Sequence, residues 1–271
     1  MVRVKMYNEY WGLTEPAFEN VADPEFLYRS AQHKQALNRL IYAVKTHKGG
    51  AMLLGEIGSG KTLISRALVL ELMPEGRWEF SVITQPMLDP VELLKEILYQ
   101  LGTGYSLKTK TDLLHALHDQ MLENHEGGRH TVLIVDEAQA ITNKETFDQL
   151  RLLTNFQVNK RFLLTLILLG QPELERKIGN MPALADRINI QYRLRGLSPS
   201  ETEQYVAHRL RIAGSDNNIF TKEAIKAVYW YSKGVPRKIN KLCDLTLVVA
   251  SNRKLKSVSQ QLISAVANEV R

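Results

Sequence analysis

The sequence of 271 residues lacks several features that would place it outside the ordinary class of globular proteins. It contains one cysteine, Cys243, so an internal disulfide framework is excluded and a reducing compartment is expected. No segment approaches the roughly 18 consecutive apolar residues of a membrane-spanning helix. The first residues, MVRVKMYNEYWG, lack the apolar stretch of a secretory signal. Together these absences predict a cytoplasmic protein without a transmembrane segment.

The excess of positive over negative charge is also small. The chain has 35 basic and 29 acidic residues, which gives a net charge of +6. Such a small excess permits contact with duplex DNA or an anionic membrane but does not require either. Hydrophobic residues make up 44% and charged residues 24%, so a sizeable core can be buried in one large domain or in a main domain with a smaller companion.

What the chain does contain is a glycine-rich loop, GEIGSGKT at 55–62, between an apolar run and a helical segment. Its spacing fits the phosphate-binding pattern GxxxxGK[ST], and its flanks supply the strand and the helix that this pattern needs. Glycines let successive backbone N–H groups point at one anion, and the following helix adds the positive end of its dipole. We therefore expect a nucleoside triphosphate here, with Lys61 on the β- and γ-phosphates and the Thr62 hydroxyl on Mg²⁺. The predicted nucleotide-binding residues are Gly55, Glu56, Ile57, Gly58, Ser59, Gly60, Lys61, Thr62 and Leu63.

Short apolar runs alternate with segments of helical periodicity, which predicts an α/β fold with a parallel five-stranded sheet flanked by helices. The expected strands are 50–55, 79–84, 131–136, 162–170 and 188–194. The helical segments between them are 60–73, 90–102, 111–125 and 144–157. After about residue 195 the strand patterns stop, and helical segments follow at 198–214, 221–234 and 236–252. We therefore predict a nucleotide-binding domain over 1–195, with an N-terminal strap and first helix at 1–45, and a small helical lid domain over 196–271.

The run TVLIVDEAQ at 131–139 ends in two adjacent carboxylates, Asp136 and Glu137. Buried strands of parallel sheets are continuous apolar runs, and ligands collect at their carboxyl ends. This position predicts Asp136 as a ligand of Mg²⁺, usually through water, and Glu137 as the group that polarises an attacking water. The alternative is a solvated strand terminus.

Two rival classes share the phosphate loop. Guanine-nucleotide proteins use a base-specific NKxD motif, but the chain offers only NKET at 143–146, with Thr146 in place of the aspartate, so ATP is favoured over GTP. A small-molecule kinase would have no use for an arginine in a separate helical domain.

Three further polar residues occupy positions that predict roles in the nucleotide site. Gln171 ends the run LILLGQ, and resemblance to ATPases in which the corresponding strand ends in a polar residue implies that it contacts the γ-phosphate and orients water, although it could instead cap the helix that starts at Pro172. Arg187 precedes the last strand and is a candidate arginine finger for a neighbouring subunit, unless it pairs with Asp186 on the surface. Arg237 starts a helix of the small domain, from which it could fold over the nucleotide of its own subunit. The arginines that compete with Arg187 are Arg176, Arg193 and Arg195.

Taken together, these motifs resemble an AAA+ ATPase. The resemblance makes GEIGSGKT the Walker A motif, VLIVDE the Walker B motif, Gln171 sensor 1, Arg187 the finger and Arg237 of GVPR sensor 2. The segment at 10–44, from YWGLTEPAF onward, is similar to the first part of ExeA/GspA-like ATPases of bacterial secretion and pilus systems. The same core is similar to transposition ATPases of the TniB/TnsC kind.

The resemblance leaves two hypotheses for the process that ATP binding and hydrolysis drive. In the first, ATP drives assembly of a ring or filament that works on a protein partner of a secretion or pilus machine. In the second, the oligomer wraps duplex DNA and ATP controls loading, as in a regulator of transposition. Lys108 and Lys110 are the candidate phosphate-backbone contacts of that second hypothesis, or else they lie in a solvated basic turn. The aromatic residues Tyr10, Trp11 and Phe18 are expected to form a strap beside the adenine, although core packing would explain any one of them.

Overall fold

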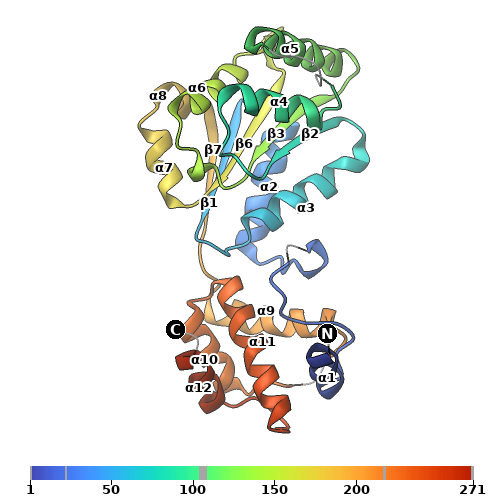
Figure 1. Cartoon of the computed structure of the whole chain (residues 1–271), viewed down its shortest axis with the longest axis vertical. Coiled ribbons are helices and arrows are strands. Elements are labelled where there is room, and N and C mark those ends of the chain that lie inside the picture. Colours follow the sequence, from blue (N-terminus) through green and yellow to red (C-terminus); the bar gives the residue numbers. More distant parts are fainter. Residues whose placement is uncertain (1, 22, 104–108, 216–217, 270–271) are drawn as a thin grey trace. The chain divides into compact units, whose positions relative to one another are not determined.

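A computed structural model describes residues 2–21, 23–103, 109–215 and 218–269 (Figure 1). Its internal contacts divide the chain into two compact units. The sheet unit comprises residues 32–56 and 64–194. The helical unit comprises residues 1–31, 57–63 and 195–271. The glycine-rich loop therefore belongs to the helical unit, although the strand before it belongs to the sheet unit.

The sheet unit is built on five parallel strands in the order β2-β3-β6-β1-β7. Their bounds are β1 Gly50–Gly55, β2 Trp78–Ile83, β3 His130–Val135, β6 Leu164–Gly170 and β7 Ile188–Leu194. The predicted α/β class with a five-stranded parallel sheet is confirmed, and four of the five predicted strands agree with the observed ones to within one residue at each end.

Helices connect the strands and cover both faces of the sheet (Figure 1). Their bounds are α2 Ala31–Lys45, α3 Lys61–Leu72, α4 Pro90–Gln100, α5 Lys110–Glu126, α6 Lys144–Leu153, α7 Pro172–Gly179 and α8 Pro182–Ala185, with one-turn helices η2 Met73–Glu75 and η3 Ala138–Ala140. A further one-turn helix, η1 Pro24–Phe26, belongs to the helical unit. Capping residues in the local sequence determine where several of these helices begin. Asp89 forms a capping box with Glu92 ahead of α4, and the Thr109 hydroxyl accepts the Asp112 N–H at the start of α5.

Alternate side chains of the strands point to opposite faces of the sheet, so the sheet unit has buried side chains on both faces. Met52 and Leu54 of β1 pack in one cluster with buried side chains of α4, α5, α6 and α7. Ala51 and Leu53, which alternate with them, are equally buried and point to the opposite face. Because both faces are covered, the central strands carry no polar alternation, as expected of a parallel sheet.

One short element differs from the prediction. Residues 162–170 were expected to form a single strand, but Gln157–Val158 (β4) and Arg161–Phe162 (β5) form an antiparallel hairpin ahead of β6. Asn159 and Lys160 both have positive φ, of 49° and 65°, which is the backbone of a two-residue type I′ turn. The helical pattern of 144–157 hid this turn because Asn-Lys is a weaker turn signal than Asn-Gly.

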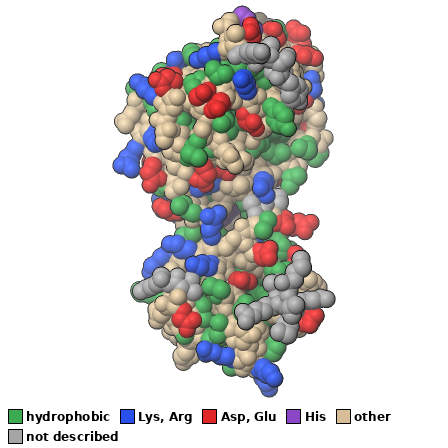
Figure 2. All heavy atoms as spheres, viewed as in Figure 1, with side chains coloured by type: hydrophobic (Ala, Val, Ile, Leu, Met, Phe, Trp, Pro, Cys, Tyr) green, Lys and Arg blue, Asp and Glu red, His purple; other side chains and the backbone are tan. Residues whose placement is uncertain are grey.

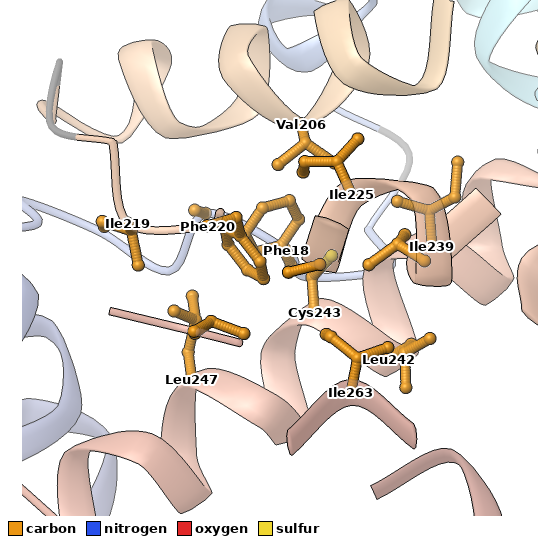
Figure 3. Packing of buried hydrophobic residues seen from close by; sticks show 14 of the residues in the cluster. Phe18, Val206, Ile219, Phe220, Ile225, Ile239, Leu242, Cys243, Leu247 and Ile263 are labelled. Atoms are coloured by element: carbon orange, nitrogen blue, oxygen red, sulfur yellow. The ribbon is translucent and has the colours of Figure 1, made fainter. Parts of the chain in front are cut away.

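The helical unit consists of α1 Val2–Trp11 and four C-terminal helices: α9 Pro199–Ile212, α10 Lys222–Ser232, α11 Pro236–Asn252 and α12 Gln260–Glu269. Figure 3 shows its core, in which side chains of α9, α10, α11 and α12 meet around Phe220 and Cys243. Burial raises the pKa of the Cys243 thiol, so this cysteine is a packed core residue and not a nucleophile. The helical nature of the C-terminal part is thus confirmed.

The N-terminal segment was assigned with the nucleotide-binding domain, but the structure groups residues 1–31 with the C-terminal helices. Trp11 and Phe18 lie in the core of the helical unit, at 6% and 1% exposure, and the Trp11 indole donates to the Leu247 carbonyl at 3.1 Å. Buried Arg209 donates to the carbonyls of Ala17 and Glu19. Two rings of the expected strap, Trp11 and Phe18, are therefore used for core packing, which leaves neither a face for stacking on a base. Tyr10 is exposed, and its hydroxyl donates to the Leu255 carbonyl at 2.9 Å.

Candidate functional site

The carboxyl ends of three neighbouring strands define one edge of the sheet, which we call the carboxyl edge. β1 ends at Gly55, where the glycine-rich loop begins, β3 is followed by Asp136, and β6 by Gln171. Since β6 lies between β3 and β1 and all three are parallel, these ends share one edge. The sheet therefore brings the predicted carboxylates and the start of the loop to the same side, where ligands bind in open α/β sheets.

The glycine-rich loop has the backbone that its glycines make possible. Gly58 and Gly60 have φ of 77° and 100°, a region that L side chains rarely adopt. The loop ends at Lys61, the first residue of α3, whose side chain is buried at 4% exposure. A lysine that opens a helix at the end of a glycine turn is the arrangement expected of a phosphate cradle.

Arg237 lies against this loop within the helical unit. Its N–H donates to the Gly58 carbonyl at 3.2 Å, and a Cβ added at Gly58 would lie 2.3 Å from the Arg237 Cβ. Glycine is therefore required at position 58 for two reasons: the backbone has a positive φ, and α11 approaches too closely for a Cβ. Pro236 occupies the first turn of α11 and fixes where Arg237 enters the helix.

The acidic pair is held rigidly after β3. Asp136 is 4% exposed, and its N–H donates to the Ile83 carbonyl at 2.8 Å, which continues the pairing of β3 with β2. Its Oδ1 accepts the Glu137 N–H at 2.8 Å. Glu137 has a φ of 50°, a left-handed conformation that costs a non-glycine residue energy and is often found at functional sites.

Gln139 was not singled out from the sequence, yet it organises the two strand ends. Its Nε2 donates to Glu137 Oε2 at 2.5 Å, and its Oε1 accepts the Gln171 N–H at 3.0 Å. The Gln171 side chain also donates to Glu137 Oε2, at 3.4 Å. No side-chain bond from Gln171 caps α7, so the helix-cap alternative does not describe this residue. The letters DEAQ contain Gln139, but only the fold shows that it faces Glu137.

Two further contacts fix the loop after the acidic pair. The Lys177 Nζ donates to the Gln139 and Ile141 carbonyls at 2.6 and 2.8 Å. Gly170 allows the strand end to approach closely, because a Cβ there would lie 2.5 Å from the Leu174 side chain and 3.0 Å from Gln139 Oε1. These lysine-to-carbonyl hydrogen bonds restrict the backbone that follows Glu137.

Arg187 lies at the opposite edge of the sheet. It precedes β7, whose first residue, Ile188, is paired with Gly50, whereas Leu194 is paired with Gly55. The five steps of β1 separate the two edges by about 17 Å. The guanidinium of Arg187 donates to Asn155 Oδ1 at 2.9 Å and lies over the Phe162 ring, so its partner is not the neighbouring Asp186.

The competing arginines take different positions. Arg193, on β7, is paired with Glu175 of α7, and Arg176 is exposed on the same helix. Arg195 is exposed directly after β7. An exposed ion pair such as that of Arg193 contributes little to stability.

The candidate DNA contacts are only partly visible. Lys108 lies outside the described residues, and Lys110 is an exposed residue at the start of α5. On the face that Figure 2 shows, basic and acidic side chains are interspersed, without a continuous basic surface. The NKET segment has a structural explanation, because Asn143 caps α6 by accepting the Glu145 N–H at 2.8 Å.

Within the described ranges no group of three or more His, Cys, Asp or Glu side chains could hold a metal ion by itself. A magnesium site of a phosphate-binding loop does not need such a group, because Mg²⁺ keeps several waters and takes one or two protein ligands together with substrate phosphates. In the same part of the chain, no helix has both the length and the apolar character to cross a membrane.

Comparison with known families decides the class. A family model described as an AAA domain matches residues 44–178. The chain carries an AAA domain. The matched range runs from the end of α2 to α7 and includes the glycine-rich loop, the acidic pair and Gln171.

Among characterised relatives, the chain is similar to general secretion pathway protein A of Aeromonas hydrophila, with 37% identity over 98% of this chain. That match covers 48% of the relative, so the chain spans about half of the relative's length. The resemblance expected from the sequence, to ATPases of the ExeA/GspA kind, is thereby confirmed at the level of similarity.

Solved structures confirm the fold of the AAA domain and its helical companion. The Drosophila origin recognition complex bound to DNA contains a chain with a TM-score of 0.71 at 17% identity, covering 99% of this chain and 66% of that one. The Aeropyrum pernix ORC2 protein gives a TM-score of 0.69 at 15% identity, covering 93% of this chain and 70% of that one. At such identities the likeness concerns the fold alone.

Proposed function

We propose that this protein binds ATP with Mg²⁺, hydrolyses it, and uses the cycle to drive assembly of an oligomer. The observation that carries this proposal is the carboxyl edge, where Gly55, Asp136 and Gln171 follow three neighbouring parallel strands. A glycine loop with a buried lysine and a carboxylate pair with a positioned glutamate are the two halves of a phosphate-transfer site.

Each half has a defined role in the proposal. The N–H groups of residues 58–62 and the Lys61 ammonium would hold the β- and γ-phosphates, and Thr62 with Asp136 would hold Mg²⁺. When bound, Mg²⁺ neutralises charge that develops on the phosphate oxygens. Glu137 would take a proton from the attacking water, and Gln171 would orient that water.

The hydrogen bonds around Glu137 support its role. Gln139 and Gln171 both donate to Glu137 Oε2, so this oxygen is oriented and Oε1 is left for water. The surrounding hydrogen bonds therefore fix the orientation of the Glu137 carboxylate, whose backbone has the left-handed φ of 50°.

Arg237 would act within the same chain and Arg187 on a neighbouring one. The contact of Arg237 with Gly58 supports a position next to the phosphate loop. Arg187 lies about 17 Å along the strands from the end of β1, on the other edge of the sheet, so it can serve only a nucleotide bound to another copy. The proposed finger role of Arg187 therefore requires an oligomer, since a finger acts on a nucleotide bound to a neighbouring copy.

The similarity to general secretion pathway protein A favours a secretion or pilus machine as the partner. The chain spans about half of that relative, so the pathway is part of the proposal. The relatives described above include no transposition protein, and on the face that Figure 2 shows the described basic residues are interspersed with acidic ones.

A complementation experiment tests the proposal. Lys61→Ala subunits keep the finger but lose the phosphate lysine, while Arg187→Ala subunits keep the site but lose the finger. Each variant alone should release phosphate from ATP at less than a tenth of the wild-type rate, and a mixture should regain part of the activity at mixed interfaces. If the Arg187→Ala protein alone hydrolyses ATP at the wild-type rate under assembling conditions, the proposed finger is wrong.

A further inference from the structure

A cavity lies at the amino ends of the strands, on the side of the sheet opposite the carboxyl edge. We call this side the amino edge. The cavity has a volume of about 360 Å³ and lies wholly within the sheet unit. Trp78 and His130 open β2 and β3 beside it, and His47 precedes β1. The lining residues are Lys45, His47, Glu75, Arg77, Trp78, His125, Gly128, Arg129, His130 and Arg161.

The charge of this lining is strongly positive. The lining contains four cationic side chains, Lys45, Arg77, Arg129 and Arg161, and one carboxylate, Glu75, so its formal charge is +3 with neutral histidines. Lys45 is paired with Glu75 and Arg129 with Glu79. Arg77 and Arg161 form no ion pair with any residue that the structure describes.

The imidazoles supply neutral polar groups. Burial lowers the pKa of His130 to about 3, and its Nε2 lies 2.9 Å from the Thr165 hydroxyl. Burial, followed by the charge of Arg161, lowers the pKa of His47 as well. The Nδ1 of His47 is buried and has no hydrogen-bond partner among the described residues, a state that costs free energy unless a ligand or water meets it. A left-handed backbone, with φ of 50°, holds His47 in this place.

An aromatic wall completes the cavity. The Trp78 indole N–H donates to Glu75 Oε2 at 3.2 Å, which fixes the ring. The His47 and His130 rings meet edge to face with centroids 4.1 Å apart, and Trp78 lies 6.2 Å from each. Because these rings are tilted against one another, the half-buried Trp78 indole is the ring that offers a face to a nucleobase.

We propose that this cavity binds a nucleoside phosphate, with Arg77 and Arg161 as its cationic contacts and Trp78 as the wall for its base. Two arginines without ion pairs match a phosphate dianion better than a single carboxylate, and guanidinium groups bind phosphate through paired hydrogen bonds. The volume suits a ligand of nucleotide size, larger than phosphate alone. The ligand is either a free nucleotide or the phosphorylated end of a nucleic-acid strand. The site is separate from the glycine-rich loop and does not depend on the proposed ATPase activity.

Calorimetric titration of the full chain with AMP tests the proposal, because AMP lacks the β- and γ-phosphates that the loop is built to hold. AMP should bind the wild-type protein and Lys61→Ala with similar affinity. The double variant Arg77→Ala with Arg161→Ala should bind AMP at least tenfold more weakly. The matched control, Arg253→Ala with Lys256→Ala, removes two exposed charges of the helical unit and should leave AMP binding unchanged.

Three results would overturn the proposal: no binding of AMP at millimolar concentration, unchanged binding in the Arg77 and Arg161 variant, or an equal loss in the control. A second titration separates the sources of the ligand. A short single-stranded oligonucleotide with a 5′-phosphate that binds more tightly than AMP, and more tightly than its 5′-hydroxyl form, assigns the cavity to nucleic-acid ends. AMP that binds at least as tightly assigns it to free nucleotides.

Discussion

The two edges of one parallel sheet contrast in how their sites are built. At the carboxyl edge, the functional residues lie within a few positions of three strand ends, and they include short consecutive motifs. At the amino edge, the cavity gathers side chains from positions 45 to 161 that share no spacing. Motifs of the first kind can be found in a sequence, whereas a site of the second kind becomes visible only when the strands are placed side by side.

The two edges also differ in whether their polar side chains have hydrogen-bond or ion-pair partners. At the carboxyl edge, Glu137 is oriented by Gln139 and Gln171, which hold each other through a further hydrogen bond. At the amino edge, buried His47 Nδ1 has no partner in the described part of the chain, and two arginines lack ion pairs there. At the first edge the polar side chains hold one another in place, whereas at the second edge a buried polar atom is left for a ligand to meet.

The largest expected effect concerns Glu137. We expect Glu137→Gln to lower ATP hydrolysis at least 100-fold, because general-base catalysis contributes about 10²–10⁴-fold. Nucleotide binding should persist, since the glutamate is not part of the phosphate cradle. Phosphate release and binding of a fluorescent ATP analogue measure the two quantities. The exposed Lys34→Ala variant is the control. Hydrolysis within tenfold of wild type would remove Glu137 from the mechanism.

At the amino edge, His130→Gln should make the stability of the sheet unit less dependent on pH. Folding lowers the pKa of His130 from the ordinary histidine value of 6.5 to about 3. The unfolded chain therefore binds the proton more tightly than the folded one, and stability falls as pH drops below 6.5. From pH 8 to pH 5, this group should cost the wild type about 2 kcal/mol, and the variant should be spared that loss.

Urea unfolding at both pH values checks this difference. Glutamine at position 130 can keep the hydrogen bond to Thr165, so it is a mild replacement. Equal losses in wild type and variant would show that His130 is protonated in the folded protein at pH 5.

Gly58→Ala should weaken nucleotide binding at least tenfold. The new Cβ would meet the Arg237 Cβ at 2.3 Å, and alanine resists a φ of 77°. Gly76→Ala is the matched control, because Gly76 has a φ of 64° but open space around it. Titration with a fluorescent ATP analogue compares the two. Equal losses of nucleotide binding would contradict the prediction, because Gly76 lies outside the loop and its substitution can weaken binding only through general destabilisation.

The smallest effect is expected for Gln139. We expect Gln139→Ala to lower kcat by about tenfold, in line with the loss of one positioning hydrogen bond of roughly 1.5 kcal/mol to a charged group. KM should change little, because Gln139 does not belong to the phosphate cradle. Steady-state kinetics, with exposed Gln157→Ala as the control, gives both constants. A rise in KM at unchanged kcat would instead assign Gln139 to nucleotide binding.

The sequence was sufficient to locate the five strands of the parallel sheet and the two motifs, because glycine spacing and apolar runs are local signals, but it did not reveal the β4–β5 hairpin. It failed where tertiary packing decided the outcome. Trp11 and Phe18 could be assigned to a strap or to a core on equal grounds, and only the contacts with α9 and α11 placed them in the core. Gln139 is adjacent to a known motif, but its bond to the backbone of Gln171 spans 32 residues and leaves no trace in the spacing.

The central claim is that the carboxyl edge holds Mg²⁺ and ATP between the glycine-rich loop and the acidic pair. Electron microscopy of the protein with a non-hydrolysable ATP analogue and Mg²⁺ tests it most directly. We predict phosphates on the amides of residues 58–62 and a magnesium ion on the side of Thr62 and Asp136. Density for the analogue elsewhere, with this edge empty, would contradict the claim.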